Sequence, residues 1–129
     1  MTERLQISSL PYREDPRAYF ASLRQRPGAV LLDSGRPAAF GGRYDIISSD
    51  PVSLLSVDGQ GNVRVDGALC EQRNPFVAQQ ALLESLSLEF PASHLPFLGG
   101  LIGYWGYDLG RALEPVGDAS APVVALPTS

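Results

Sequence analysis

The chain has no lysine, one cysteine and one histidine. All ten basic residues are arginines and none of them form a block or a stripe, so the sequence predicts no nucleic-acid partner. Cys70 has no second thiol with which to form an internal disulfide or a metal site. His94 lies between two prolines, where no Ser-His-Asp or Cys-His arrangement can be built on it. We therefore expect no catalytic residue, no metal ligand and no cofactor in this chain, and a cytoplasmic location.

Long hydrophobic segments are also missing. The apolar runs are too short to span a bilayer, and the first residues, MTERLQISSLPYRED, do not resemble a signal peptide. The glycines of GGLIGYWGYDLG (99–110) do not have the spacing of a dinucleotide or nucleotide phosphate loop. The sequence thus predicts no membrane association and no nucleotide site.

The composition that remains is that of a folded domain. The chain has 129 residues, 44% of them hydrophobic, and a net charge of -4, which suits a single domain over 1–129 with a real core. Alternation and apolar runs predict strands near 4–10, 29–33, 43–48, 52–57, 62–65, 68–72 and 97–107. We expect 29–33 to be buried on both faces. The predicted fold class is α+β, a mainly antiparallel sheet with two or three helices on one face.

Three local signals mark where elements begin or turn. Asp15-Pro16 and Asn74-Pro75 each place a capping side chain before a proline, so helices are predicted from there to about 26 and 88. Asp66-Gly67 predicts a two-residue hairpin turn. A short helix at 108–114 and the start of a strand at 123–126 are expected beyond the glycine-rich segment.

The stretch LLDSGRPAAFGGRYDIISSDP (31–51) carries the candidate site. Asp33 or the Ser34 hydroxyl could accept from an ammonium group, Arg43 could bind a carboxylate, and Gly41-Gly42 could let a flat ring approach the backbone. Together these groups would suit a small zwitterion with an aromatic side chain. The alternative is a turn stabilised by an ion pair between Asp33 and Arg43.

Three segments resemble a known family. LLDSG (31–35), GRYDIISSDP (42–51) and PFLGGLIGYWGYDLGR (96–111) are similar, in order and spacing, to the N-terminal domain of aminodeoxychorismate (para-aminobenzoate) synthase component 1. These proteins belong to the anthranilate synthase component 1 family. The GYDLGR motif (106–111) looks closer to the aminodeoxychorismate branch.

The resemblance implies an activity for a parent protein. Component 1 proteins convert chorismate, with ammonia and Mg²⁺, to 4-amino-4-deoxychorismate on the way to para-aminobenzoate and folate. Their ammonia comes from a glutamine amidotransferase subunit, component 2. The chorismate and Mg²⁺ residues lie in a C-terminal chorismate-binding domain that this chain does not contain. We therefore expect a non-catalytic N-terminal domain, either produced by itself or ending naturally at Ser129.

The resemblance also implies a tryptophan pocket between the two strands of the opening stretch. The residues carried over by position are Leu32, Ser34, Gly41, Gly42, Arg43 and Tyr44. Some relatives have an aromatic residue in place of Gly41 and a serine in place of Gly42. We expect these departures to enlarge the pocket or to remove contacts from its wall.

Two other functions remain open. The chain could be the N-terminal domain of an anthranilate synthase component 1, in which the same pocket senses tryptophan. It could also be a stand-alone amino-acid-binding or scaffold domain, with its ligand in the same 32–44 region.

Overall fold

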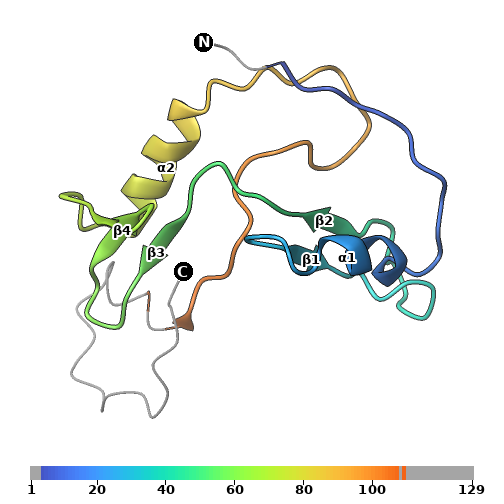
Figure 1. Cartoon of the computed structure of the whole chain (residues 1–129), viewed down its shortest axis with the longest axis horizontal. Coiled ribbons are helices and arrows are strands. Elements are labelled where there is room, and N and C mark those ends of the chain that lie inside the picture. Colours follow the sequence, from blue (N-terminus) through green and yellow to red (C-terminus); the bar gives the residue numbers. More distant parts are fainter. Residues whose placement is uncertain (1–3, 108, 110–129) are drawn as a thin grey trace. The chain divides into compact units, whose positions relative to one another are not determined.

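The computed structural model of the chain describes residues 4–107 and 109 (Figure 1). The chain divides into two compact units. One comprises Ile7–Val52 and is called here the two-stranded unit. The other comprises Met1–Gln6 with Ser53–Ser129 and is called the three-stranded unit. The prediction of one domain over 1–129 stays a prediction, and each unit is described by itself.

The two-stranded unit consists of one short helix and one antiparallel ribbon. Helix α1 (Arg17–Leu23) packs against strand β2 (Ile46–Ser48), which pairs with β1 (Val30–Leu32) so that Leu32 lies opposite Ile46. The predicted cap is wrong by one residue, because Pro16 and not Asp15 is the N-cap, and no side chain caps the helix. Asp15 lies just before the cap and accepts the Arg17 backbone N–H at 2.9 Å. The helix ends at Leu23, three residues before the predicted end.

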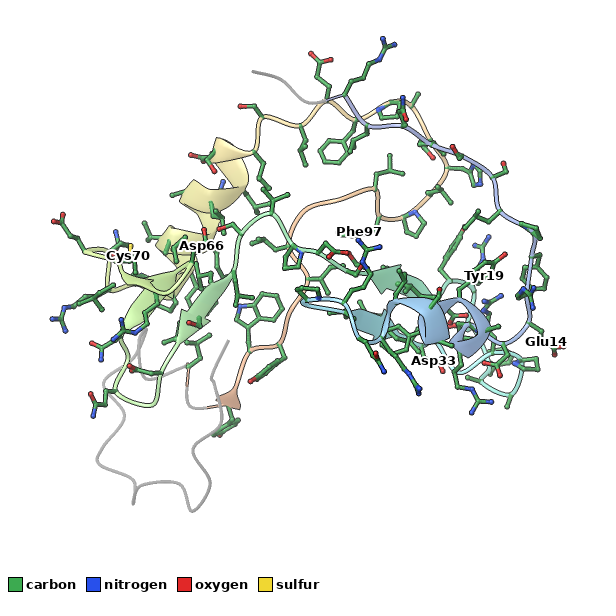
Figure 2. The ribbon with its side chains drawn as sticks, in the orientation of Figure 1. Glu14, Tyr19, Asp33, Asp66, Cys70 and Phe97 are labelled. Carbon is green, nitrogen blue, oxygen red and sulfur yellow. The ribbon has the colours of Figure 1, made fainter. Side chains whose placement is uncertain are left out.

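The three-stranded unit contains an antiparallel meander in the order β3-β4-β5. The strands are β3 (Leu55–Val57), β4 (Val63–Val65) and β5 (Ala68–Leu69). Asp66 and Gly67 both have positive φ, 51° and 82°, which is the conformation of a type I′ turn and confirms the predicted hairpin. The Asp66 carboxylate (Figure 2) accepts the Leu54 N–H and the Ser53 hydroxyl, both at 2.8 Å, and so ties the turn to the segment before β3.

Helix α2 (Pro75–Ser85) covers this meander. Asn74 caps it as predicted, because its side-chain oxygen accepts the N–H groups of Phe76 at 3.0 Å and Val77 at 3.4 Å. Ala78 of this helix belongs to the buried apolar core. The other members of the core are Val57 of β3, Val63 of β4 and Leu109.

Several predicted elements differ from the structure. Residues 4–10 form no strand beyond a single bridge between Arg4 and Glu89, and the predicted strand at 97–107 is irregular. Strand β1 is not buried on both faces, since Leu32 is 45% exposed. The predicted helix at 108–114 and strand at 123–126 lie largely or wholly outside the described residues.

The fold class is nevertheless the predicted one. The described residues form two helices and five strands, and every strand pairing between them is antiparallel, which confirms the α+β class. Neither helix in the described part of the chain has the length and apolar character needed to cross a membrane.

Candidate functional site

The candidate site is the loop 33–45, which joins β1 to β2 and is called here the ligand loop. All six residues carried over by resemblance lie in it or at its edge. Leu32 ends β1, Ser34 is half-buried just after it, and Tyr44 is 38% exposed shortly before β2. The Arg43 guanidinium carbon lies 5.4 Å from the centre of the Tyr44 ring, a distance at which a cation and an aromatic face attract.

The two glycines of the loop have different surroundings. A Cβ atom on Gly42 would lie 2.7 Å from the Ser34 carbonyl oxygen and 3.1 Å from Arg36 Cγ, so the loop has closed over the place where a side chain would be. Gly41 has a φ of +87° and nothing within 4 Å of its Cβ position. A side chain at Gly42 would therefore meet the loop itself, whereas the space beside Gly41 is open, and the predicted enlargement of the pocket or loss of wall contacts stays a prediction.

The loop is held by an ion pair that the sequence analysis did not identify. Asp45 accepts the Ser34 backbone N–H at 2.8 Å and the Ser34 hydroxyl at 2.9 Å, both on Oδ1, while its Oδ2 pairs with Arg36 Nη2. The Asp45 side chain is 4% exposed and that of Arg36 is 18% exposed. The predicted alternative, an ion pair between Asp33 and Arg43, is not what the structure contains. Asp33 instead accepts the Gly35 N–H at 2.7 Å.

The electrostatics follow from this pairing. The hydrogen bond from Arg36, followed by that from the Ser34 backbone, lowers the pKa of Asp45 to about 2, so this carboxylate is ionised at neutral pH. The Ser34 hydroxyl has only one proton and gives it to Asp45, so toward a ligand it can only accept. Arg43 forms no ion pair with any described residue and can receive a carboxylate.

These two groups match the two ends of an amino acid. An ammonium group could donate to Ser34 and a carboxylate could accept from Arg43, while the Tyr44 ring offers an aromatic face. The tryptophan pocket formed by these residues stays a prediction. The structure brings Ser34 next to Gly42, and Arg43 next to Tyr44.

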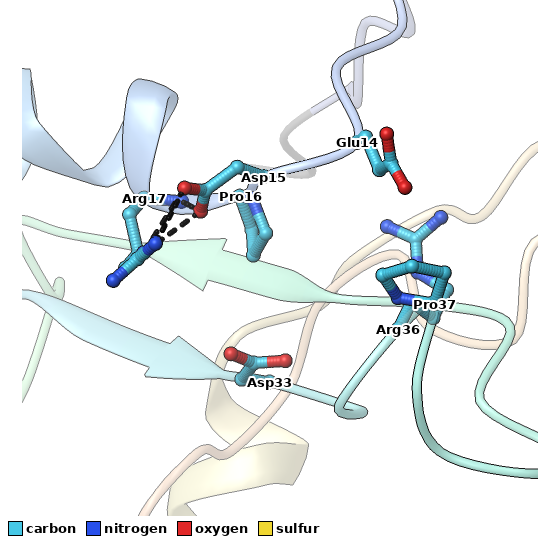
Figure 3. Close-up of a pocket in the computed structure, with 7 residues that line it drawn as sticks. All are labelled: Glu14, Asp15, Pro16, Arg17, Asp33, Arg36 and Pro37. Carbon is cyan, nitrogen blue, oxygen red and sulfur yellow. Dashed lines mark hydrogen bonds and ion pairs between the residues drawn. The ribbon is translucent and has the colours of Figure 1, made fainter.

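A separate cavity of about 380 Å³ lies on the α1 side of this loop (Figure 3). None of the six carried-over residues lines it. Its walls carry both signs of charge: the Asp15 carboxylate is bound by Arg17, and Glu14 points toward the guanidinium of Arg36. The lining residues are Glu14, Asp15, Pro16, Arg17, Asp33, Arg36 and Pro37. Among the described residues, no group of three or more His, Cys, Asp or Glu side chains is placed to hold a metal ion.

Arg36 and Asp45 are the site residues that sequence reasoning missed. A signal for Asp45 was present, since a carboxylate directly before the apolar strand 46–48 must find partners as that strand is covered. Arg36 had no such signal, because its position in the middle of the loop does not indicate which carboxylate it meets.

Among known proteins, the chain is similar to two kinds of component 1 protein, those of aminodeoxychorismate synthase and of anthranilate synthase. No family model matches the chain. Curated relatives do match it, and they carry the names of the family that the motifs at 31–35, 42–51 and 96–111 resemble. The predicted resemblance is thereby confirmed.

The individual relatives are of two kinds. The chain is 36% identical to aminodeoxychorismate synthase component 1 of Salmonella typhimurium over 94% of its own length, and 38% identical to that of Klebsiella aerogenes over 82%. It is 30% identical to anthranilate synthase component 1 of Pseudomonas aeruginosa over 85% of its length. The match spans 28%, 24% and 23% of these relatives, respectively, or about a quarter of each protein.

Proposed function

We propose that this chain is the N-terminal, non-catalytic part of an aminodeoxychorismate synthase component 1. The observation that carries the proposal is the 36% and 38% identity to two proteins of that name, against 30% to the anthranilate synthase component of Pseudomonas aeruginosa. In the proposed parent, a C-terminal domain binds chorismate and Mg²⁺, and component 2 supplies ammonia from glutamine. The product is 4-amino-4-deoxychorismate, and the proposed location is the cytoplasm.

The alternative parent is an anthranilate synthase component 1. Relatives of that kind match at 30% and 32% identity, and aminodeoxychorismate synthase component 1 of Escherichia coli matches at 30%. Sequence identity alone therefore does not decide between the two parent proteins. The product that each forms from chorismate does.

The test uses the complete reading frame that contains this chain. The protein is incubated with chorismate, ammonia and Mg²⁺, and the product is identified by mass and fluorescence. Aminodeoxychorismate is the expected product. Anthranilate would overturn the proposal in favour of tryptophan synthesis, and no conversion of chorismate would overturn both parents. The 129-residue chain alone, assayed in parallel, is expected to leave chorismate unchanged.

Within this protein, we propose that the ligand loop binds an amino acid of the tryptophan type. Support comes from the accepting hydroxyl of Ser34, from Arg43, which has no ion-pair partner among the described residues, and from the ring of Tyr44. These groups suit an ammonium group, a carboxylate and an aromatic side chain, respectively. A stand-alone binding domain would use the same groups without a catalytic partner domain.

The binding proposal is tested with L-tryptophan on the 129-residue chain. A ligand that binds the folded state raises the unfolding temperature in a saturable way. Indole-3-propionate, which lacks the ammonium group, is the matched control and is expected to give a smaller shift. The absence of any shift at millimolar L-tryptophan would count against a binding site in this chain.

A further inference from the structure

We propose that Arg36 is a positioning residue that sets the shape of the ligand loop by clamping Asp45 against Ser34. This inference rests on the proposed amino-acid site, and it adds a residue that the resemblance does not include. Arg36 does not need to touch the ligand for this role.

The clamp joins the two ends of the loop. Ser34 lies two residues after the end of β1 and Asp45 directly precedes β2, so a bond between them closes the loop just beyond the paired residues Leu32 and Ile46. Both oxygens of Asp45 are used, Oδ1 by Ser34 and Oδ2 by Arg36. A carboxylate this well covered has to be compensated, and Arg36 is its only ion-pair partner among the described residues.

The clamp also fixes the chemistry of the Ser34 hydroxyl. As long as Asp45 is held by Arg36, the Ser34 proton points to Asp45 Oδ1 and the hydroxyl presents lone pairs to its other side. Without Arg36, the Asp45 carboxylate is more stable when it turns toward water. The Ser34 hydroxyl can then rotate and donate its proton to another group. Arg36 thereby helps to decide whether the loop selects a ligand that donates a hydrogen bond.

Two further contacts hold Arg36 itself. Its Nη1 donates to the Tyr12 hydroxyl at 3.0 Å, and its guanidinium carbon lies 5.6 Å from the centre of the Tyr12 ring. The Arg36 side chain also runs past Gly42, where an added Cβ would come within 3.1 Å of its Cγ. Arg36 thus links Tyr12, in the segment before α1, to Ser34 through Asp45.

The test compares three variants of the 129-residue chain. Arg36→Gln removes the charge, Arg36→Lys keeps it, and Arg26→Gln is the matched control because it breaks the exposed pair with Asp50 in the same unit. Three quantities are measured: the dissociation constant for L-tryptophan, the hydrogen-exchange rate of the Ser34 amide, and the titration of Asp45 by NMR.

Arg36→Gln is expected to weaken L-tryptophan binding and to speed Ser34 exchange by about ten-fold each, since it leaves a covered polar group without its partner. The pKa of Asp45 should rise at the same time. Arg36→Lys should recover part of each change, and Arg26→Gln should cause none. A merely structural role for Arg36 would also speed exchange elsewhere in the two-stranded unit, for example at the Arg24 amide, which donates to the Phe20 carbonyl at 2.8 Å at the end of α1 and which we expect to stay unchanged.

The outcomes separate the clamp from the binding site. If the unaltered chain does not bind L-tryptophan, the proposed site fails, while Ser34 exchange and Asp45 titration still decide whether the clamp exists. If Arg36→Gln leaves the Ser34 exchange rate and the Asp45 titration as they were, the clamp is overturned, whatever happens to affinity.

Discussion

Each of the two units is stabilised internally by a different kind of interaction. In the three-stranded unit, Val57, Val63, Ala78 and Leu109 form a buried apolar core. In the two-stranded unit, β1 and β2 are half-buried or exposed, and the best-covered ion pair of the described residues, Arg36 with Asp45, closes the candidate site. Stabilisation by apolar burial does not depend on pH or on the orientation of the side chains. A charged, hydrogen-bonded pair depends on the protonation state and on the geometry of its two groups. The unit with the candidate site should therefore respond to single polar changes, and the other to loss of volume.

The largest effect is expected from shortening Val63. Val63 is 1% exposed and belongs to the apolar core, so Val63→Ala removes two buried methyl groups and leaves a cavity. The expected cost is about 2–3 kcal/mol of unfolding free energy, measured by urea denaturation. Leu69→Ala is the control, because Leu69 is 62% exposed and should cost much less. Equal losses for the two variants would show that the core is not where the structure places it.

A smaller effect is expected from filling the closed space in the ligand loop. In Gly42→Ser the new Cβ would meet the Ser34 carbonyl oxygen at 2.7 Å, a backbone atom that cannot move without shifting the loop. Overpacking of this kind costs roughly 1–3 kcal/mol. Gly59→Ser is the control, since nothing lies within 4 Å of its Cβ position. Thermal unfolding that is unchanged in Gly42→Ser would mean that the loop is more open than in the structure.

The same contrast explains what the sequence could predict. Elements marked by local chemistry were predicted well: Asn74 caps α2, and Asp66-Gly67 forms its turn. These signals act within a few residues and need no distant partner. The segment 97–107 was predicted as a strand from its apolar residues, but a strand also requires a neighbour with free backbone groups, which no local pattern specifies.

Pairing inside the candidate site could not be predicted for a related reason. The loop contains two carboxylates, Asp33 and Asp45, and two guanidinium groups, Arg36 and Arg43. Their spacing along an irregular loop allows several pairs, and the choice depends on how the loop closes. Asp33 is used locally by the Gly35 N–H, which leaves Asp45 for Arg36 and Arg43 for the Tyr44 ring.

Removing the cap of α2 should have a modest effect. Asn74→Ala leaves the N–H groups of Phe76 and Val77 without their side-chain acceptor, at an expected cost of about 1 kcal/mol. Asn74→Asp should retain most of the stability, because a carboxylate accepts the same bonds and suits the positive end of the helix. Circular dichroism during urea unfolding measures both variants, and an Asp variant as weak as the Ala variant would contradict capping as the cause.

The most local effect is expected from acid. The pKa of Asp45 is lowered to about 2, chiefly by Arg36, whereas an unfolded aspartate titrates near roughly 3.9. Because the folded pKa is the lower one, Asp45 stabilises the folded state fully above about pH 4, and this contribution is lost as the pH falls toward 2.

Acid also acts on other carboxylates, so the measurement has to be local. Hydrogen bonds from Asn62 and Leu54 lower the pKa values of Asp58 and Asp66 in the three-stranded unit, and Arg17 lowers that of Asp15. The amide chemical shift of Ser34, which donates directly to Asp45, should titrate with a midpoint near pH 2, and Asp45→Asn should abolish that titration. A midpoint near 3.9 would mean that Arg36 does not hold Asp45 in solution, and the difference between the two units would then rest on apolar burial alone.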